Sequence, residues 1–407
     1  MAVLWAAAIV PAAMGFWLVA GSLAGVPHAR IHTLLAGALL ALGLATLLQV
    51  GLGFRLPMYE GPASAYLAAI GVVAGAGHHG LGAITGGLLA AGIFVAGLGV
   101  LRVDRLMVRF FTPLVARVFP LVVILAVLPA TLERAVGATH GLPGSGSAWA
   151  ATLVVVGTVL AMRRLSRLTP YVMLCALVAG TAIYFVLSGL PHADVAGGLA
   201  GPPLLPWGAP NVQAGVVFPF VLAGALAALN TIASGTVMSV THDLEVRPGA
   251  ARTSFLMHGA ALAGGALVGN LVGNVSRLES PGIVRLLGHL GRAPLLFMGV
   301  ALGALAFVRP VVDLAAMLPL SVSAALLAVL LGVVVVQALE GIREEPPAVR
   351  WLVVAPSLIP SAIWIVFGSS MGALAQLLAN PMLWGVLLAM GLERIVRRRL
   401  PETPPTT

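Results

Sequence analysis

The sequence predicts an all-α integral membrane protein with fourteen transmembrane segments, arranged as two inverted repeats of seven with interrupted third and tenth spans. Three observations predict this class. The composition is strongly apolar, apolar runs of about the length that crosses a bilayer recur along the chain, and arginines fall in alternate connections.

The composition excludes an ordinary soluble domain. Of the 407 residues, 60% are hydrophobic and 9% are charged, and the mean hydropathy is +1.06. Soluble domains carry about 25% charged residues, so this chain must be embedded in a lipid bilayer. The formal net charge of +9 would indicate nucleic-acid binding in a soluble protein. Here the arginines lie in short loops and at the C-terminus, so we expect no nucleic-acid partner.

Metal and cofactor sites are not indicated. The single cysteine, Cys175, excludes a disulfide framework and a cysteine-based metal site. The pairs His78–His79 and His242–Asp243 lack the ligand spacing of a closed metal site. The sequence has no phosphate-binding motif and no nucleophile–base set. We therefore expect no metal, no cofactor and no enzymatic activity.

The expected spans are apolar runs bounded by Arg, Pro, Gly or His clusters. They cover residues 3–25, 32–52, 57–76, 80–101, 106–130, 147–162, 170–190, 214–240, 254–272, 278–290, 293–308, 315–339, 349–367 and 372–393. The first run lacks the basic start of a signal peptide, so we expect it to be retained as a span.

Arginines set the expected orientation. They follow spans two, four, six, eight, twelve and fourteen, whereas the connections after odd-numbered spans are poor in them. We therefore expect a multi-pass protein of the inner (cytoplasmic) membrane with both termini cytoplasmic. The basic run 394–399 should contact anionic lipid at the cytoplasmic surface.

Two stretches interrupt the apolar pattern in corresponding halves of the chain. Span one begins near residue 3 and span eight near 214, and seven spans per half invert the second half in the membrane. "RLPMYEGPASAYL" (55–67) and "GNVSRLESPGIV" (273–284) each place a Glu beside Gly and Pro. Paired interrupted helices in inverted repeats are typical of secondary transporters. We expect each to be an extended stretch leading into a half-helix, whose free N–H groups can face a substrate.

These two stretches resemble the nucleobase–cation symporters, the uracil/xanthine permeases that also include nucleobase–ascorbate transporters. "LPMYEGPASAYL" is similar to the third span of that family, and "GNLVGNVSRLESPGIV" to its tenth span, where a substrate-binding Glu follows an Asn. "FVLAGALAALNTIASGTVMSV" (220–240) is similar to the eighth span, but Asn230 stands where the family usually has Glu. The Gln-His often found in the family's first span has no evident match.

The resemblance implies a division into core and gate domains, with a possible homodimer through the gate. The expected boundaries are 1–105 for the first core repeat, 106–190 for the first gate repeat, 191–213 for an extracellular loop, 214–308 for the second core repeat, 309–395 for the second gate repeat and 396–407 for a basic cytoplasmic tail.

Glu279 is the strongest candidate site residue. An ionisable group inside a span costs a few kcal/mol, so it normally faces a cavity or a partner. The resemblance places it on the family's substrate-binding Glu, where it would accept hydrogen bonds from ring N–H groups. The alternative is a structural ion pair with Arg277 or Arg285.

Glu60 is a second acid inside a span. In one reading it enters the same cavity and carries a coupling proton, alone or with Glu279. In the other it lies at the cytoplasmic edge of its span, paired with Arg55.

The remaining candidates surround these two acids. Asn230 could bind a carbonyl and a ring N–H at once, or could join two helices. The other expected substrate-binding residues are Asn274, Ser64, Ala65, Tyr66, Leu278 and Ser280, with Ser234 and Arg277 along the pathway.

The function we expect is proton-coupled uptake of a uracil- or xanthine-like base. The alternative is an anion transporter of the sulfate-permease type, in which Arg277 and the half-helix N-termini would hold the anion. Glu279, two residues from Arg277, argues against that reading because a carboxylate repels anions.

Overall fold

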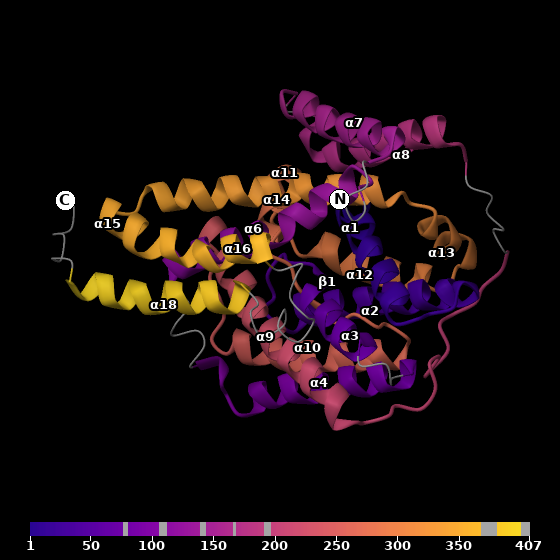
Figure 1. The fold of residues 1–407 in the computed structure, drawn as a ribbon, viewed down its shortest axis with the longest axis horizontal. Coiled ribbons are helices and arrows are strands. Elements are labelled where there is room, and N and C mark those ends of the chain that lie inside the picture. Colours follow the sequence, from indigo (N-terminus) through magenta and orange to yellow (C-terminus); the bar gives the residue numbers. More distant parts are fainter. Residues whose placement is uncertain are drawn as a thin grey trace.

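The computed structural model describes the chain except for residues 76–79, 106–111, 139–143, 166–167, 191–196, 368–380 and 400–407. These gaps contain His78 and His79, the start of the expected external loop, and most of the expected tail. The described residues are mostly helical (Figure 1).

The longer helices are α1 (Ala2–Leu23), α2 (Ile31–Gly51), α4 (Leu81–Val100), α6 (Pro113–Ala135), α7 (Gly146–Arg163), α8 (Val172–Ser188), α9 (Ala214–His242), α10 (Ala250–Leu267), α12 (Ala293–Leu305), α14 (Leu320–Arg343), α16 (Ala355–Phe367) and α18 (Pro381–Arg399). The shorter elements are η1 (His28–Arg30), β1 (Glu60–Pro62), α3 (Ser64–Gly75), η2 (Thr169–Tyr171), β2 (Asn274–Ser276), α11 (Ser280–Leu287), α13 (Arg309–Ala316), α15 (Pro347–Val349) and η3 (Arg350–Val354).

The structure confirms an integral membrane protein built from apolar helices. Within the described residues, eight helices are long and apolar enough to cross a bilayer. Every predicted span overlaps one of the helices above, while the count of fourteen crossings and the inverted repeats stay predictions. The last helix runs to Arg399, beyond the expected end of the span at 393. Arg is a good helix former, and the Glu393–Arg397 pair, one turn apart, holds this end together at 2.8 Å.

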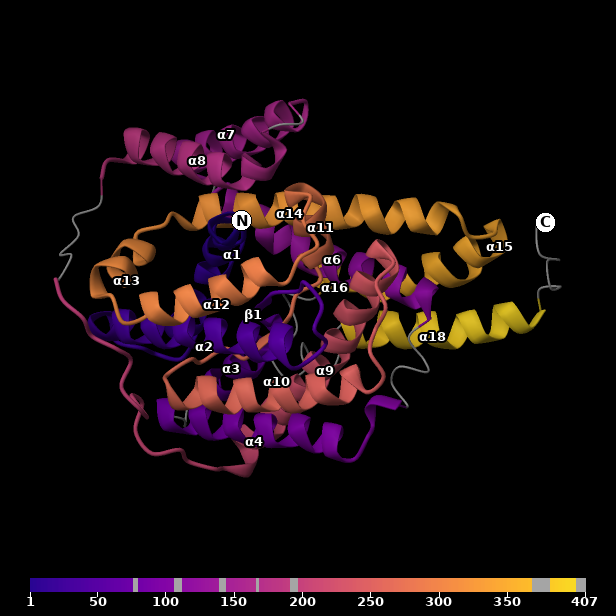
Figure 2. The same cartoon turned by 180° about the vertical axis from the view of Figure 1, so that it is seen from behind.

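Two helix pairs connect the two halves of the chain. α4 packs along α10, and α12 packs along α2 (Figures 1 and 2). A Cβ on Gly43 of α2 would lie 2.5 Å from the carbonyl oxygen of Gly299 of α12, and a Cβ on Gly259 of α10 would lie 2.5 Å from that of Gly92 of α4. Small residues let helix backbones approach this closely in membranes. Each pair joins a helix of the first half to one of the second.

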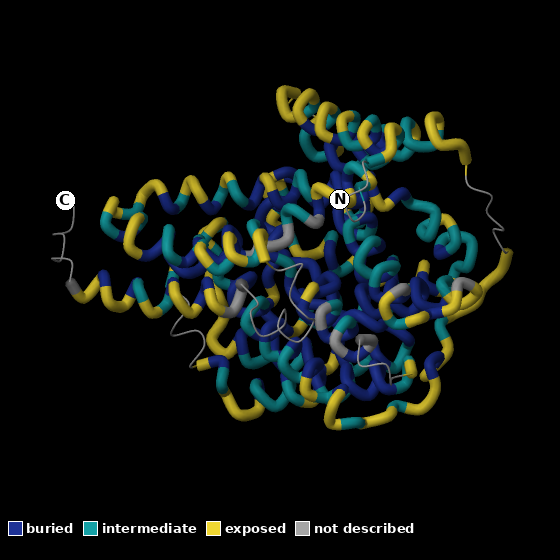
Figure 3. The backbone as a smooth tube through the Cα atoms, viewed as in Figure 1, coloured by how far each residue is buried: buried dark blue, intermediate teal, exposed yellow. Residues whose placement is uncertain are grey.

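Apolar side chains also cover the outside of the molecule. Trp149, Leu153 and Val186 of the α7–α8 hairpin are exposed, and Figure 3 shows that much of this hairpin is exposed. An α-helix bonds its backbone polar groups internally, so such an outward apolar face suits lipid. The hairpin projects from the rest of the bundle in Figure 1.

Candidate functional site

The two interrupted stretches meet in the centre of the bundle. β1 pairs with β2 in an antiparallel ladder that sets Glu60 opposite Ser276, Gly61 opposite Val275 and Pro62 opposite Asn274. All of these residues are buried. The expected extended segments are thus confirmed. Unpaired backbone at this depth would leave N–H and C=O groups without partners. The ladder supplies those partners from a segment more than 200 residues away in the sequence.

A short helix follows each strand. α3 begins at Ser64, two residues after β1, and α11 begins at Ser280, four residues after β2. The two glutamates do not occupy corresponding places in this arrangement. Glu60 lies in the strand, whereas Glu279 is the residue directly before α11. The shared Glu–small–Pro pattern therefore does not mark structurally equivalent glutamates.

Arg277 and Glu279 form a two-point ion pair in which Glu279 is buried and Arg277 is partly buried. Arg277 Nη2 lies 2.7 Å from Glu279 Oε1, and Arg277 Nε lies 3.0 Å from Oε2. Arg277 Nη1 also donates to the carbonyl oxygen of Pro62 at 2.7 Å, and its guanidinium lies 5.7 Å from the centre of the Phe16 ring. The expected ion-pair alternative is thus present, with Arg277 as the partner. Arg285 instead pairs with Glu340 at 2.9 Å.

Glu60 is held by the strand partner. Its side chain is 1% exposed, and Oε1 accepts a hydrogen bond from Ser276 Oγ at 2.6 Å. Arg55, which is exposed and has a φ of 60°, forms no ion pair with it. The reading of Glu60 as an edge residue beside Arg55 was therefore wrong, because the β1–β2 ladder draws it inward.

Two side chains of helix α9 form hydrogen bonds to strand β2. Asn230 Nδ2 and Ser234 Oγ donate to the same acceptor, the carbonyl oxygen of Ser276, at 3.0 and 2.8 Å. They lie four residues apart and so share one face of α9. Both donors thus serve the joining role that was the alternative for Asn230.

The other predicted site residues differ in burial and in hydrogen bonding. Asn274 is buried and its Oδ1 has no hydrogen-bond partner among the described residues. Tyr66 is fully buried with a hydroxyl that also lacks a partner there, and its ring packs against Gly273. Ser280 Oγ donates to the carbonyl oxygen of Arg277 at 2.7 Å. Ala65 and Leu278 are buried, and Ser64 is exposed at the start of α3.

Ser276, Tyr59 and Phe16 complete the site and were missed from the sequence. Ser276 and Asn274 alternate along β2, and a strand alternation of polar residues could have indicated them together. Tyr59 precedes the strand, and its N–H donates to Ser280 Oγ at 3.3 Å. Phe16 comes from α1, and no local pattern links it to Arg277.

A small cavity adjoins the ion pair. Phe16, Tyr59, Pro62 and Arg277 are among the residues that line it, and its volume of about 10 Å³ has room for about one water molecule. Ligand pockets usually measure about 300–1,000 Å³. The candidate site is therefore closed in this conformation.

Residues 1–369 match the model Xan_ur_permease, described as Permease family. Among curated proteins, "Putative purine permease YwdJ" of Bacillus subtilis (strain 168) is 24% identical over 247 residues, covering 58% of this chain. That match spans 56% of the relative's own length.

Solved structures share the fold. The transmembrane domain of the cyanobacterial bicarbonate transporter BicA matches with a TM-score of 0.59 and 18% identity, over 92% of this chain and 96% of that one. The murine anion transporter Slc26a9 in its inward-facing state matches with a TM-score of 0.57 and 16% identity, over 98% of this chain and 67% of that one. At these identities the likeness concerns the architecture alone.

Proposed function

Because this chain belongs to the Permease family (Xan_ur_permease), we propose that it takes up a uracil- or xanthine-like nucleobase by secondary active transport, driven by protons. It is a membrane transporter, as its family and apolar helices require. The observation that carries the substrate assignment is the largely buried Arg277–Glu279 pair beside the start of α11.

The pair offers a donor and an acceptor side by side. Arg277 can donate to a ring carbonyl while Glu279 accepts from the adjacent ring N–H. Uracil and xanthine carry carbonyl and N–H groups next to each other, so one edge of the base can replace the bonds that now join the two side chains. A hydrogen bond to a charged group contributes about 1.5–3 kcal/mol. Pro62 would keep Arg277 oriented through its carbonyl oxygen during the exchange.

The transport cycle we propose moves one part of the bundle against the other. The core, 1–105 and 214–308, carries the strand pair, and the gate, 106–190 and 309–395, packs against it. Fourteen spans in two inverted repeats, cytoplasmic termini and a location in the inner membrane belong to the same proposal. Glu60, bonded to Ser276 in the strand pair, would carry the coupling proton. The proposal also includes a homodimer that forms through the gate domains.

Anion transport is the second candidate, favoured by Arg277 at the half-helix and by the fold shared with BicA. Three acceptor contacts already hold the guanidinium of Arg277, two from Glu279 and one from Pro62. An anion would have to displace a carboxylate that its own charge repels. The pair therefore suits a neutral ligand better.

Uptake into proteoliposomes tests the proposal. We expect radiolabelled uracil or xanthine to enter, to accumulate with an inward proton gradient and to be unaffected by sulfate or bicarbonate. Competition by sulfate or bicarbonate without competition by bases would establish the anion reading instead.

Substitution of the pair tests the site. Glu279→Gln should weaken base binding by about tenfold to a hundredfold. Removing one partner of a buried ion pair can also destabilise a protein by about 3–5 kcal/mol, so thermal stability must be measured with binding. The charge-balanced double variant Arg277→Gln/Glu279→Gln removes the same recognition without an unpaired charge. Asp313→Asn, in a partly exposed pair with Arg309 at 3.8 Å, is the matched control. Unchanged base binding in the folded double variant would refute the assignment.

A further inference from the structure

A second and much larger cavity is lined by residues outside the strand pair. Its volume is about 400 Å³, within the range of pockets that hold small organic ligands. Residues of α6, α9 and α14 form most of its wall, and Arg285 of α11 completes it. These include Arg117, Val240, His242 and Gln337.

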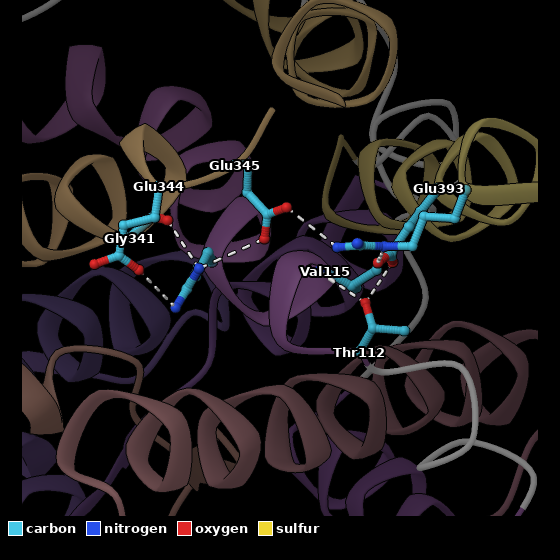
Figure 4. A network of polar contacts seen from close by, with 8 residues as sticks. Thr112, Val115, Gly341, Glu344, Glu345 and Glu393 are labelled. Atoms are coloured by element: carbon cyan, nitrogen blue, oxygen red, sulfur yellow. Dashed lines mark hydrogen bonds and ion pairs between the residues drawn. The ribbon is translucent and has the colours of Figure 1, made fainter. Parts of the chain in front are cut away.

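The charges at this cavity are already balanced. Arg285 pairs with Glu340 at 2.9 Å. Arg117 donates to the carbonyl oxygen of Gly341 at 2.8 Å and lies 3.5 Å from Glu344. Figure 4 shows that this contact belongs to a network that continues through Glu345 and Glu393. With each cation beside a carboxylate, the cavity favours a neutral ligand over an anion.

The network also holds Arg117 in place. Its Nη1 lies 3.5 Å from Glu345, which accepts from Arg397 at 3.2 Å, and Arg397 pairs with Glu393 at 2.8 Å. Thr112 caps the start of α6 and bonds Glu393. Contacts with α18 therefore stabilise the cavity wall that α6 and α14 form.

Part of the cavity wall is apolar, and the lining residue Gln337 carries a buried acceptor that has no partner among the described residues. Val237, Val334 and Ala338 are buried. Gln337 donates through Nε2 to the carbonyl oxygen of Pro281 at 3.4 Å. Its Oε1 is buried and has no hydrogen-bond partner among the described residues. An unsatisfied buried acceptor costs about 1–3 kcal/mol. A ligand N–H in the cavity would satisfy it once the Gln337 side chain turns its Oε1 toward the cavity.

The cavity also borders the candidate site. His242 Nε2 lies 3.3 Å from the same Pro281 oxygen, and Pro281 is two residues from Glu279. α9, which holds the strand pair through Asn230, ends at this cavity with His242.

We propose that this cavity is a second binding subsite for the transported base, of lower affinity than the strand-pair site, in which Gln337 Oε1 accepts a ring N–H. The inference rests on the proposed function. The subsite would lie between the strand pair and the side of the membrane on which the exposed pair Arg285–Glu340 is found. A base could bind there before or after it occupies the strand-pair site. A neutral planar heterocycle fits the volume, the balanced charge and the unpaired acceptor of Gln337 together.

Protection of an introduced cysteine tests the subsite. Cys175 lies in α8, outside this cavity, so Cys175→Ala provides a background without cysteine. Val240→Cys then places one thiol in the cavity wall, and Val336→Cys places a control thiol on an exposed part of α14 that does not line it. Maleimide labelling of each purified variant is measured by mass spectrometry at increasing uracil or xanthine concentration.

The decisive measurement uses the double variant Arg277→Gln/Glu279→Gln, which removes the strand-pair site. We expect the base still to protect the thiol of Val240→Cys and not that of Val336→Cys. Gln337→Leu should then raise the half-protecting concentration by about tenfold or more. Loss of protection in the double variant, equal protection of both thiols, or no effect of Gln337→Leu would each overturn the subsite.

The two proposals fail in different ways. If the unmodified chain binds no base in equilibrium dialysis, the proposed function fails and the subsite with it. If it binds one base per chain, and binding disappears in the double variant, the proposed function stands and only the subsite is refuted.

Discussion

Arg277 changes the chemistry of the site as much as Glu279 does. In the structure each is the other's partner, so neither acts as an isolated charge. The cost of burying two charges is offset only when the geometry is good and further hydrogen bonds are made. The two bonds to Glu279 and the one to Pro62 meet this condition. A base that enters the site must therefore exchange bonds with the pair instead of meeting a free carboxylate.

Arg277→Lys tests this exchange. A lysine ammonium cannot form the two-point contact of a guanidinium, so it cannot hold Glu279 and the Pro62 oxygen in the same geometry. We expect about tenfold weaker binding of uracil or xanthine, with the protein still folded because the charge is kept. Equilibrium binding and thermal unfolding should be measured on the same sample. Base affinity equal to that of the unmodified protein would show that Arg277 is structural only.

Of the two acids at the strand pair, Glu279 has a two-point cation partner and Glu60 has none among the described residues. It accepts from Ser276 at 2.6 Å inside the buried strand pair. If it carries the coupling proton, Glu60→Gln should retain base exchange and lose accumulation driven by a proton gradient. Gln can still accept from Ser276, so the ladder should be kept. Both fluxes are measured in proteoliposomes, with Asp313→Asn alongside. Gradient-driven accumulation at the unmodified level would assign the proton to another group.

At the scale of elements, the strand pair depends on the helices that hold it. α9 binds the Ser276 oxygen through two side chains, and α4–α10 and α2–α12 support the bundle around it. The glycines of these pairs make close backbone approach possible. A Cβ on Gly43 would lie 2.5 Å from one carbonyl oxygen and 2.9 Å from the N–H nitrogen of Gly303.

Gly43→Ala and Gly259→Ala should therefore separate their helix pairs. Overpacking of this kind typically costs about 1–3 kcal/mol, and we expect a lower unfolding temperature in detergent for each variant. Gly97→Ala, also in α4, is the matched control because nothing lies within 4 Å of the added Cβ. If all three variants unfold at the same temperature, close helix approach is not what those glycines provide.

At the scale of the whole molecule, the arginine pattern makes a topological prediction. In a Cys175→Ala background, Arg164→Cys should lie on the cytoplasmic side and Leu204→Cys on the external side. Both positions are exposed in the structure. A membrane-impermeant maleimide added to intact cells should label Leu204→Cys and reach Arg164→Cys only after lysis. The reverse pattern would invert the proposed orientation.

The sequence by itself determined the class of the protein and the places where its spans are interrupted. Apolar content and run length depend on local composition, and the bilayer imposes its own length on a helix. For the same reason the ranges expected for the spans overlap the observed helices. Gly and Pro beside Glu60 and Glu279 indicated non-helical backbone because their effect on dihedral angles is local.

Only the tertiary structure decided which groups meet. The register that places Glu60 opposite Ser276 joins residues more than 200 positions apart. The choice of Arg277 over Arg285 as partner of Glu279 depends on the turn into α11, and Arg285 is instead drawn to Glu340 of α14. Asn230 and Ser234 find their acceptor only once α9 lies against β2. Spacing along a chain reports the period of an element, whereas a partner is set by how elements pack, and that is a property of the whole fold.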